Sequence, residues 1–419
     1  MEFHLLDFFN WKSITHSYTP TIFILVLLMN THSKLWLLFL GRLETEKGFD
    51  LIFDFINQYP GKELPFELYI FGSGSYEKWL LELSHHFKQI HFFGRKPLSE
   101  VERYLDNIDY CLMPSRFLET FWLSAINVLK RGIPVVGFKK WGLFPFIPEE
   151  YAIDQCKGSN DLAKFATMLI QLQKEKTEKK SDFYQELAEK SKAIAQNYTK
   201  EKRFKHFKEL TVDLKGKKIV LVSDFINKIG GIETYLHDVK TLLEKEGYKV
   251  KLFGSNCPKG RIGKLKKLFG IGLSTLNLWE SIRFSIFIKK EKPDLIRYHS
   301  MIRRNGRLPL WFTRKNRAKK WMMYHDFGYF TPYPHQLSDT KQIKTPLSLK
   351  HYLAMANTKN PIKKFLICGK YLTLTLLKKQ LKKQIDLHLV PSAFIVPIVE
   401  KSFGLPIEKI SDFNHFIQE

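Results

Sequence analysis

The sequence predicts an α/β protein made of two Rossmann-like domains, each with a parallel sheet. From Lys34 onward, short apolar runs alternate with longer amphipathic segments, the pattern of parallel strands joined by helices. This alternation stops after a stretch rich in Lys and Glu and restarts at Lys217. The 419 residues, 44% of them hydrophobic, suffice for about two domains that each bury a core.

The elements of the first half follow from these runs in chain order. Continuous apolar runs predict strands buried on both faces, at residues 36–41, 66–74, 90–94, 108–115 and 133–138. Apolar residues repeated at helical spacing predict the helices between and after them, at residues 49–59, 76–87, 98–107, 120–132 and in the stretch 174–210.

The second half repeats the same logic. The sequence KKIVLVSDF begins it as a strand, and Gly230-Gly231 opens a helix that runs through Leu243. Later apolar runs predict strands at residues 248–254, 293–300, 319–326 and 385–392. The expected organisation is therefore a leader at residues 1–33, a first domain at 34–213 and a second at 217–419.

The leader gives no sign of export. Its most apolar run, TIFILVLLM at residues 21–29, has about nine residues where a bilayer span needs about 20. The start MEFHLLDFF lacks the basic region of a signal peptide, and the four cysteines form no C-x-x-C pair that would suggest a zinc site or disulfide framework. A cytoplasmic location is expected.

Charge divides unevenly between the halves. Residues 1–213 carry 28 Lys and Arg against 27 Asp and Glu, whereas residues 214–419 carry 39 against 15. The second half thus has a net charge of +24, which points it toward an anionic partner.

The first candidate site lies where the first strand ends. In FLGRLETEKGFD, Gly41 and Arg42 follow the strand and Lys47 precedes a helix. Two cations around such a turn can straddle a diphosphate, and ligands of these sheets bind at the carboxyl ends of strands. The glycines of the next turn, Gly72 and Gly74, belong to the same edge. Two ordinary solvated loop cations explain Arg42 and Lys47 equally well.

A second motif is PSRFLETFWLSAINVLKRGIPVV. Glu119 is expected at the start of a helix and Asn127 two turns later, so both can point along one face. Taken alone, a capping carboxylate and a solvated amide are the simpler interpretation.

Together these pieces resemble the donor-binding domain of the retaining glycosyltransferase family four, over residues 35–210. The family pattern is GR-x-x-x-x-KG, a Gly-rich turn, a P-S-x-x-E-x-F-G-x-x-x-x-E helix and G-x-P-V. The resemblance implies a GT-B fold, with Arg42 and Lys47 on the nucleotide diphosphate and Glu119 on the donor sugar. It implies no metal or other cofactor, because cationic side chains and helix dipoles serve the diphosphate in this family.

The sequence departs from that pattern at three positions. Asn127 stands where the family has a second Glu for the ribose, so a charge-assisted hydrogen bond is lost. Trp122 replaces the glycine beside the sugar, and Trp141 stands where a Gly-Gly turn is usual. Our hypothesis is that both tryptophans reflect an opal codon that is read as Gly, and a TGG codon at either position would rule this out there. If Trp122 is the true residue, its indole fills the space that the sugar needs, and we expect Asn127 and Trp122 to impair the enzyme.

The second half resembles the amino-terminal domain of the same family. Residues 217–253 match its opening, with the G-G-x-E loop at Gly230, Gly231 and Glu233, and KPDLIRYHS, MMYHD and DLHLVPSAF follow in the family's order. The resemblance places His325 at a family histidine that reaches the active cleft, although a structural role is as well supported for a single strand-end histidine. The family has its domains in the opposite order, so the order here is inverted.

Two cationic segments are amphipathic. In residues 259–270, apolar residues recur at helical spacing among Arg261, Lys264, Lys266 and Lys267, which suits an anionic membrane surface as well as a packed helix. For residues 363–384 packing is favoured.

The function expected from the resemblance is transfer of a sugar from a nucleotide sugar to a sugar or lipid-linked acceptor, with retention, by a protein peripheral to the inner membrane face. A non-catalytic remnant that binds nucleotide or membrane is the alternative. The chain is a circular permutant, a fusion of two partial transferases or a gene-prediction artefact. No nucleic-acid motif is found.

Overall fold

The computed structural model describes residues 34–419 except 60–62, 140, 141, 143, 155–160, 179, 180, 215, 228–230, 257–277, 303–307, 333–347, 414 and 416–419. The chain divides into two packing units. The first comprises residues up to Arg116, Asn127–Lys140 and Phe144–Ile194, and the second comprises Phe117–Ile126, Trp141–Leu143 and Ala195–Glu419. The expected leader lies outside the described residues.

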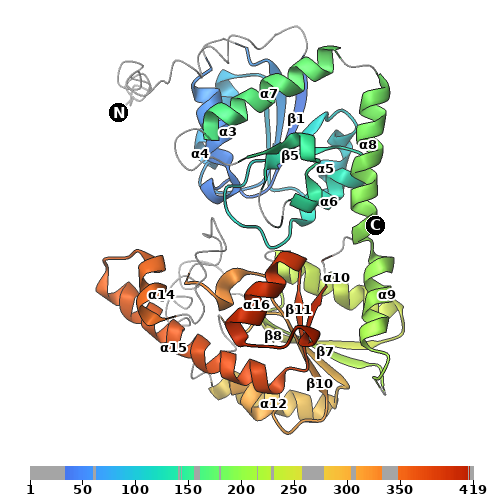
Figure 1. Ribbon diagram of the computed structural model, residues 1–419, viewed down its shortest axis with the longest axis vertical. Helices are drawn as coiled ribbons and strands as arrows, with labels where there is room; N and C mark the ends of the chain where they lie inside the picture. Colours follow the sequence, from blue (N-terminus) through green and yellow to red (C-terminus); the bar gives the residue numbers. More distant parts are fainter. Residues whose placement is uncertain are drawn as a thin grey trace. The chain divides into compact units, whose positions relative to one another are not determined.

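A six-stranded parallel sheet forms the centre of the first unit (Figure 1). Its strands are β1 (Leu35–Leu40), β2 (Phe66–Phe71), β3 (Ile90–Gly94), β4 (Tyr110–Met113), β5 (Val135–Phe138) and β6 (Ala152–Ile153). They lie in the order β3-β2-β1-β4-β5-β6, and every pair is parallel. The order reverses between β1 and β4, the switch point at which such sheets bind ligands.

Helices connect these strands, as expected for parallel pairs. The connecting helices are α3 (Phe49–Asn57), α4 (Glu77–His86), α5 (Leu98–Leu105) and α6 (Leu123–Lys130), and two further helices, α7 (Asp161–Glu178) and α8 (Ser181–Ala195), follow β6. All residues of β4 and β5 are buried, so both faces of the sheet are covered.

The second unit contains another six-stranded parallel sheet. Its strands are β7 (Lys218–Phe225), β8 (Lys249–Ser255), β9 (Leu295–Tyr298), β10 (Lys319–Met323), β11 (Leu387–Val390) and β12 (Ile410–Asp412), in the order β12-β11-β10-β9-β7-β8. Here the order reverses between β7 and β9. The two parallel sheets confirm the predicted α/β class.

Alternate residues of the second sheet enter different cores. Ile219 and Leu221 pack under α9 (Lys200–Leu210) and α10 (Gly231–Lys245). Val220 and Val222 enter a larger core on the other face. The helices of that face are α12 (Leu278–Glu291), α13 (Leu308–Phe312), α14 (Leu349–Ala356), α15 (Pro361–Gln384) and α16 (Val396–Phe403), shown in Figure 1.

Three details differ from the sequence-based expectation. Helix α6 begins at Leu123 instead of residue 120. The stretch 174–210 is not one helix, because α8 ends at Ala195 and α9 starts after Thr199, whose side chain caps it by accepting from Lys202 N (3.4 Å). The short strands β6 and β12 were not expected. The sheets divide between β6 and β7, whereas the packing units divide at Ala195, because Phe204 and Phe207 of α9 belong to the second core.

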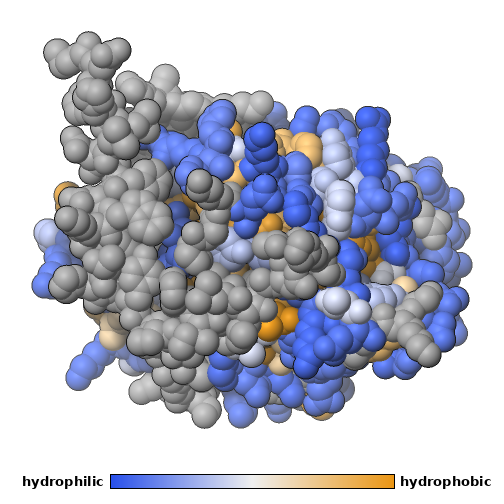
Figure 2. Space-filling model, turned by 90° about the horizontal axis from the view of Figure 1, so that it is seen from above, coloured by the Kyte–Doolittle hydropathy of each residue, from blue (hydrophilic) through white to orange (hydrophobic). Residues whose placement is uncertain are grey.

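On the described part of the face seen in Figure 2, hydrophilic residues predominate, with hydrophobic ones in small areas between them. None of the helices in the described part is long and apolar enough to cross a bilayer.

Candidate functional site

The turn after β1 is fixed against the Gly-rich turn after β2. Gly41 N donates to Phe71 O and Leu43 N donates to Ser73 O, both at 3.0 Å. A Cβ atom on Gly72 would lie 1.8 Å from Gly41 O, which no side chain permits. The Gly-rich turn is therefore glycine because two backbones meet there.

The same loop also contacts the turn after β4. Ser115 Oγ donates to Glu46 O (2.8 Å), and Arg116 forms an ion pair with Asp50. A Cβ atom on Gly48 would lie 1.9 Å from Pro114 O. The turns after β1, β2 and β4 thus meet at the carboxyl edge of the first sheet, at its switch point.

The two predicted phosphate-binding cations lie on this loop. Arg42 is half exposed, and its Nη1 contacts Glu46 Oε1 at 2.5 Å. A guanidinium has five donors, so the remaining N–H groups of Arg42 can serve a ligand. Lys47 is half-buried at the end of the short helix Thr45–Lys47, immediately before Gly48 and the start of α3. Their diphosphate role stays a prediction.

Glu44 is a further residue of this edge, outside those predicted from the sequence. Its carboxylate accepts from Ser75 N (3.0 Å) and from Ser75 Oγ (2.7 Å). These two hydrogen bonds join the turn after β1 to the loop before α4. Gly74 precedes Ser75 in that loop, and a Cβ atom added to it would lie 2.3 Å from Leu43 O. The sequence signal that could have indicated Glu44 is a carboxylate shortly after a strand, in a domain whose next strand ends in a Gly-Ser turn.

The placement expected for Glu119 is wrong in one respect. Because α6 begins at Leu123, Glu119 lies in the preceding loop, and the shared helix face with Asn127 does not exist. Instead the backbone oxygen of Glu119 closely approaches Gly142, at which a side chain would collide with it. Asn127 is half-buried on α6, and Trp122 is 4% exposed. Trp141 lies outside the described residues.

The second sheet has polar residues at its own switch point. His299 follows β9, and its N–H donates to Val222 O of β7 (2.7 Å). Ser300 Oγ donates to Asp224 Oδ2 (2.7 Å). This edge also carries His325, which follows β10.

His325 is the middle member of a stack of three buried imidazoles. His325 Nε2 lies 2.9 Å from His299 Nδ1, and His325 Nδ1 lies 3.3 Å from His415 Nε2. The outer nitrogens, His299 Nε2 and His415 Nδ1, are buried and have no hydrogen-bond partner. A neutral imidazole donates through one nitrogen only, so both hydrogen bonds of the stack run in the same direction. One outer nitrogen is therefore a donor and the other an acceptor.

The stack is neutral near pH 7. Burial, followed by the charge of Arg297, lowers the pKa of His415 to about 3. Burial also lowers the pKa of His325 and His299 well below the usual range, with smaller contributions from the neighbouring histidines and Arg297. Proton donation by His325 thus requires one of its two His–His hydrogen bonds to open.

The G-G-x-E segment approaches this stack through its helix. Gly231 is the first residue of α10, and Glu233 is buried in its first turn. Two residues later, the ring of Tyr235 contacts those of His325 (5.5 Å) and His415 (4.1 Å). Gly230 lies outside the described residues. Two parts of the second-half resemblance, separated by about 90 residues, are thereby adjacent.

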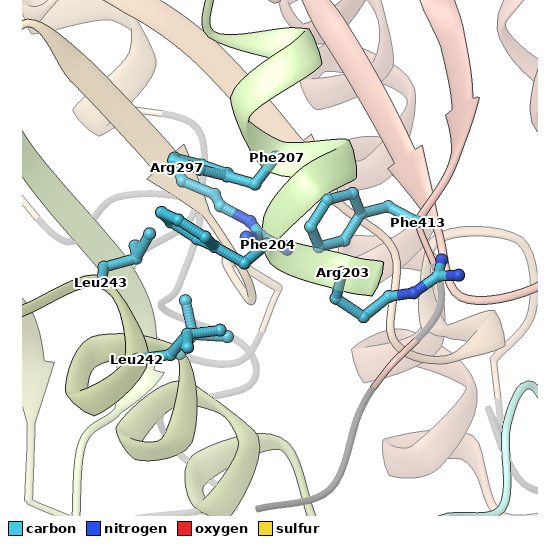
Figure 3. A pocket seen from close by; sticks show the side chains of 8 residues that line it. Arg203, Phe204, Phe207, Leu242, Leu243, Arg297 and Phe413 are labelled. Carbon is cyan, nitrogen blue, oxygen red and sulfur yellow. The ribbon is translucent and has the colours of Figure 1, made fainter. Parts of the chain in front are cut away.

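A narrow hollow lies between α9, α10 and β9 (Figure 3). Apolar side chains line most of it, including Phe204, Phe207 and Leu243. The guanidinium of Arg297 lies over the ring of Phe413 at 4.8 Å, while that of Arg203 points away and donates to Asn197 O (3.2 Å). None of the predicted site residues lines this hollow. Among the described residues, no group of His, Cys, Asp and Glu side chains could hold a metal ion.

Part of the chain is similar to known proteins. Residues 30–191 match the family model of glycosyl transferases group 1. No curated protein sequence matches.

Several solved structures are similar at low identity. The pneumococcal O-GlcNAc transferase GtfA, solved with UDP and GlcNAc, is 20% identical over 44% of this chain and 37% of its own, with a TM-score of 0.35. The catalytic domain of the cholesterol-α-glucosyltransferase from Helicobacter pylori is 16% identical over 39% of this chain and 99% of its own, with a TM-score of 0.32. WaaG, a glycosyltransferase involved in lipopolysaccharide biosynthesis, is 17% identical over 48% of this chain and 53% of its own, with a TM-score of 0.33. The chain spans 37% of the length of GtfA.

Proposed function

We propose that this chain is a GT-B glycosyltransferase that takes a sugar from a nucleotide-sugar donor. The donor binds to the first unit, and the transfer retains the anomeric configuration, as in family four. The match of residues 30–191 to group 1 glycosyl transferases supports this proposal.

The observation that carries the proposal is the meeting of three turns at the switch point of the first sheet. Arg42 and Lys47 lie on the central turn, which contacts Ser73 on one side and Ser115 on the other. Helix α3 begins directly after Gly48, so the positive end of its dipole is at the same edge. This arrangement suits a diphosphate, with Glu119 proposed for the sugar hydroxyls and Asn127 for the ribose.

The test is isothermal titration of the full chain with UDP and GDP. Arg42→Ala and Lys47→Ala should each weaken nucleotide binding by about 1–3 kcal/mol, the contribution of a hydrogen bond to a charged group. Arg103→Ala, on α5, is the control that removes a cation elsewhere in this unit. Unchanged affinity in both site variants would place the diphosphate elsewhere, and no binding of either nucleotide would leave only the non-catalytic alternative.

Three further parts of the proposal need their own measurements. Retention is tested by the anomeric configuration of the product. Transfer by the isolated full chain would support a permuted whole enzyme, whereas transfer only with a second transferase would support a fusion of partial ones. Membrane docking through residues 259–270, which lie outside the described residues, predicts that neutralising their four cations weakens sedimentation with anionic vesicles.

A further inference from the structure

Helix α12 has two apolar faces. Its inner face packs Ser281, Phe284 and Ile288 into the core. A second stripe, Trp279, Ile282 and Ile286, occupies positions i, i+3 and i+7, which share a helix face, and it faces solvent. Trp279 is 75% exposed and Ile286 62%. A surface helix needs only one apolar stripe, so the outer one is not explained by folding.

The neighbouring helices extend this exposed surface. Of the fourteen large apolar side chains that are exposed in the described part of the chain, ten belong to α12, α13, α14 and α15. These helices pack on one another in a series: α12 contacts α13, and α13 and α14 contact α15. We name their solvent side the outer helix face; its exposed apolar residues are Leu278, Trp279, Ile282, Ile286, Trp311, Phe312, Leu349, Ile362, Phe365 and Leu372.

The charges of the outer helix face are mainly positive. The four helices contain eleven Lys and Arg residues and two glutamates, Glu280 and Glu291. Glu280 is buried and paired with Arg283 at 2.8 Å. Lys363 and Lys364 are exposed beside Phe365, which is itself 78% exposed. Beyond α13, the guanidinium of Arg314 lies 4.5 Å from the ring of Trp311.

We propose that the outer helix face docks on an anionic lipid surface. Apolar and aromatic side chains interleaved with lysines are what a helix lying in a membrane interface requires: the rings enter the acyl boundary and the cations meet the headgroups. A second copy of this chain would bring the same exposed lysines, such as Lys363 and Lys364, against themselves, which opposes self-association. The proposal concerns described helices and is independent of donor binding.

The test uses the full chain with vesicles of phosphatidylcholine alone or mixed with phosphatidylglycerol. Trp279→Ser/Ile286→Ser should reduce partitioning into the mixed vesicles about tenfold or more, since the burial of apolar surface is lost. The matched control is Trp79→Ser/Ile407→Ser, which removes the same residue types from exposed positions elsewhere; Ile407 is 61% exposed. Lys363→Gln/Lys364→Gln should reduce partitioning about tenfold and weaken its salt dependence.

A second readout locates the indole itself. Trp279→Phe keeps an apolar ring, so binding should persist, but quenching of tryptophan fluorescence by brominated phosphatidylcholine should fall. Equal partitioning of the site and control variants, or quenching unchanged in Trp279→Phe, would overturn the proposal. If Trp279→Ser/Ile286→Ser instead converts an oligomer to a monomer without vesicles, the face binds protein and the lipid assignment is wrong. UDP titration of each variant separates these outcomes from failure of the glycosyltransferase proposal.

Discussion

A comparison of two glycines of the first unit can measure how much the close approach of its loops contributes to stability. Gly48 and Gly94 both have positive φ, +73° and +69°. A Cβ atom on Gly94 would meet nothing within 4 Å, whereas one on Gly48 would lie 1.9 Å from Pro114 O. The two positions therefore share the same backbone strain and differ in the contact.

Substitution by alanine should have very different costs at these positions. At Gly94 the left-handed conformation costs about 1–2 kcal/mol, part of which is offset by the lower entropy of the unfolded chain. At Gly48 the loops must also separate until the new contact exceeds 3.0 Å. That movement strains the Ser115–Glu46 hydrogen bond and the Arg116–Asp50 pair, at about 1 kcal/mol or more each. Gly48→Ala should thus lower the free energy of unfolding of the first unit by about 2–4 kcal/mol more than Gly94→Ala.

The assay is amide hydrogen exchange of the full chain in increasing urea, read from peptides of β1 and α3. It reports the opening of the first unit alone, which a single unfolding curve of a protein with two units does not. UDP titration provides a second readout: Gly48→Ala should weaken nucleotide binding and Gly94→Ala should not. Equal destabilisation by the two substitutions would refute the argument that this close approach holds the site together.

Two further predictions concern buried aromatic rings. Burial lowers the pKa of His388 to about 3, against about 6.5 when unfolded, so the unfolded chain binds more protons as the pH falls below 6.5. From this group alone, the second unit should lose about 2 kcal/mol of stability between pH 7 and pH 5. His388→Asn should remove that share of the pH dependence, read by amide hydrogen exchange in urea from peptides of β11; an unchanged slope would contradict it. Trp122→Gly should lower the free energy of unfolding by about 3–5 kcal/mol because the indole is buried, as measured by amide hydrogen exchange in urea. Higher turnover with UDP-sugar at unchanged stability would instead mean that the indole only blocks the sugar.

The strands were predictable because each is an apolar run between turn residues. The predicted strand at residues 36–41 corresponds to β1 (Leu35–Leu40), and that at 133–138 to β5 (Val135–Phe138). Helix ends were harder to predict. The run from residue 174 to 210 has helical composition throughout, and only a cap such as Thr199 marks the break.

The edge that carries the first candidate site was predictable for a related physical reason. Gly72 and Gly74 are required where the backbones of two turns meet, so sequence alone marks that edge. The distance between Ser115 and Glu46 could not be foreseen, because it depends on β1 and β4 being neighbours. That pairing joins residues about 70 positions apart, and no local pattern specifies it.

The histidine stack shows the same limit and changes what His325 can do. His299, His325 and His415 each follow a strand, and only the parallel pairing of β9 with β10, β10 with β11 and β11 with β12 brings their ends to one edge. A strand-end histidine considered alone would offer a free ring nitrogen to a ligand. In the stack, both nitrogens of His325 are occupied by imidazoles, and the atoms without partners are His299 Nε2 and His415 Nδ1. A proton that leaves or enters this edge must therefore pass through one of the outer histidines, or break a hydrogen bond within the stack.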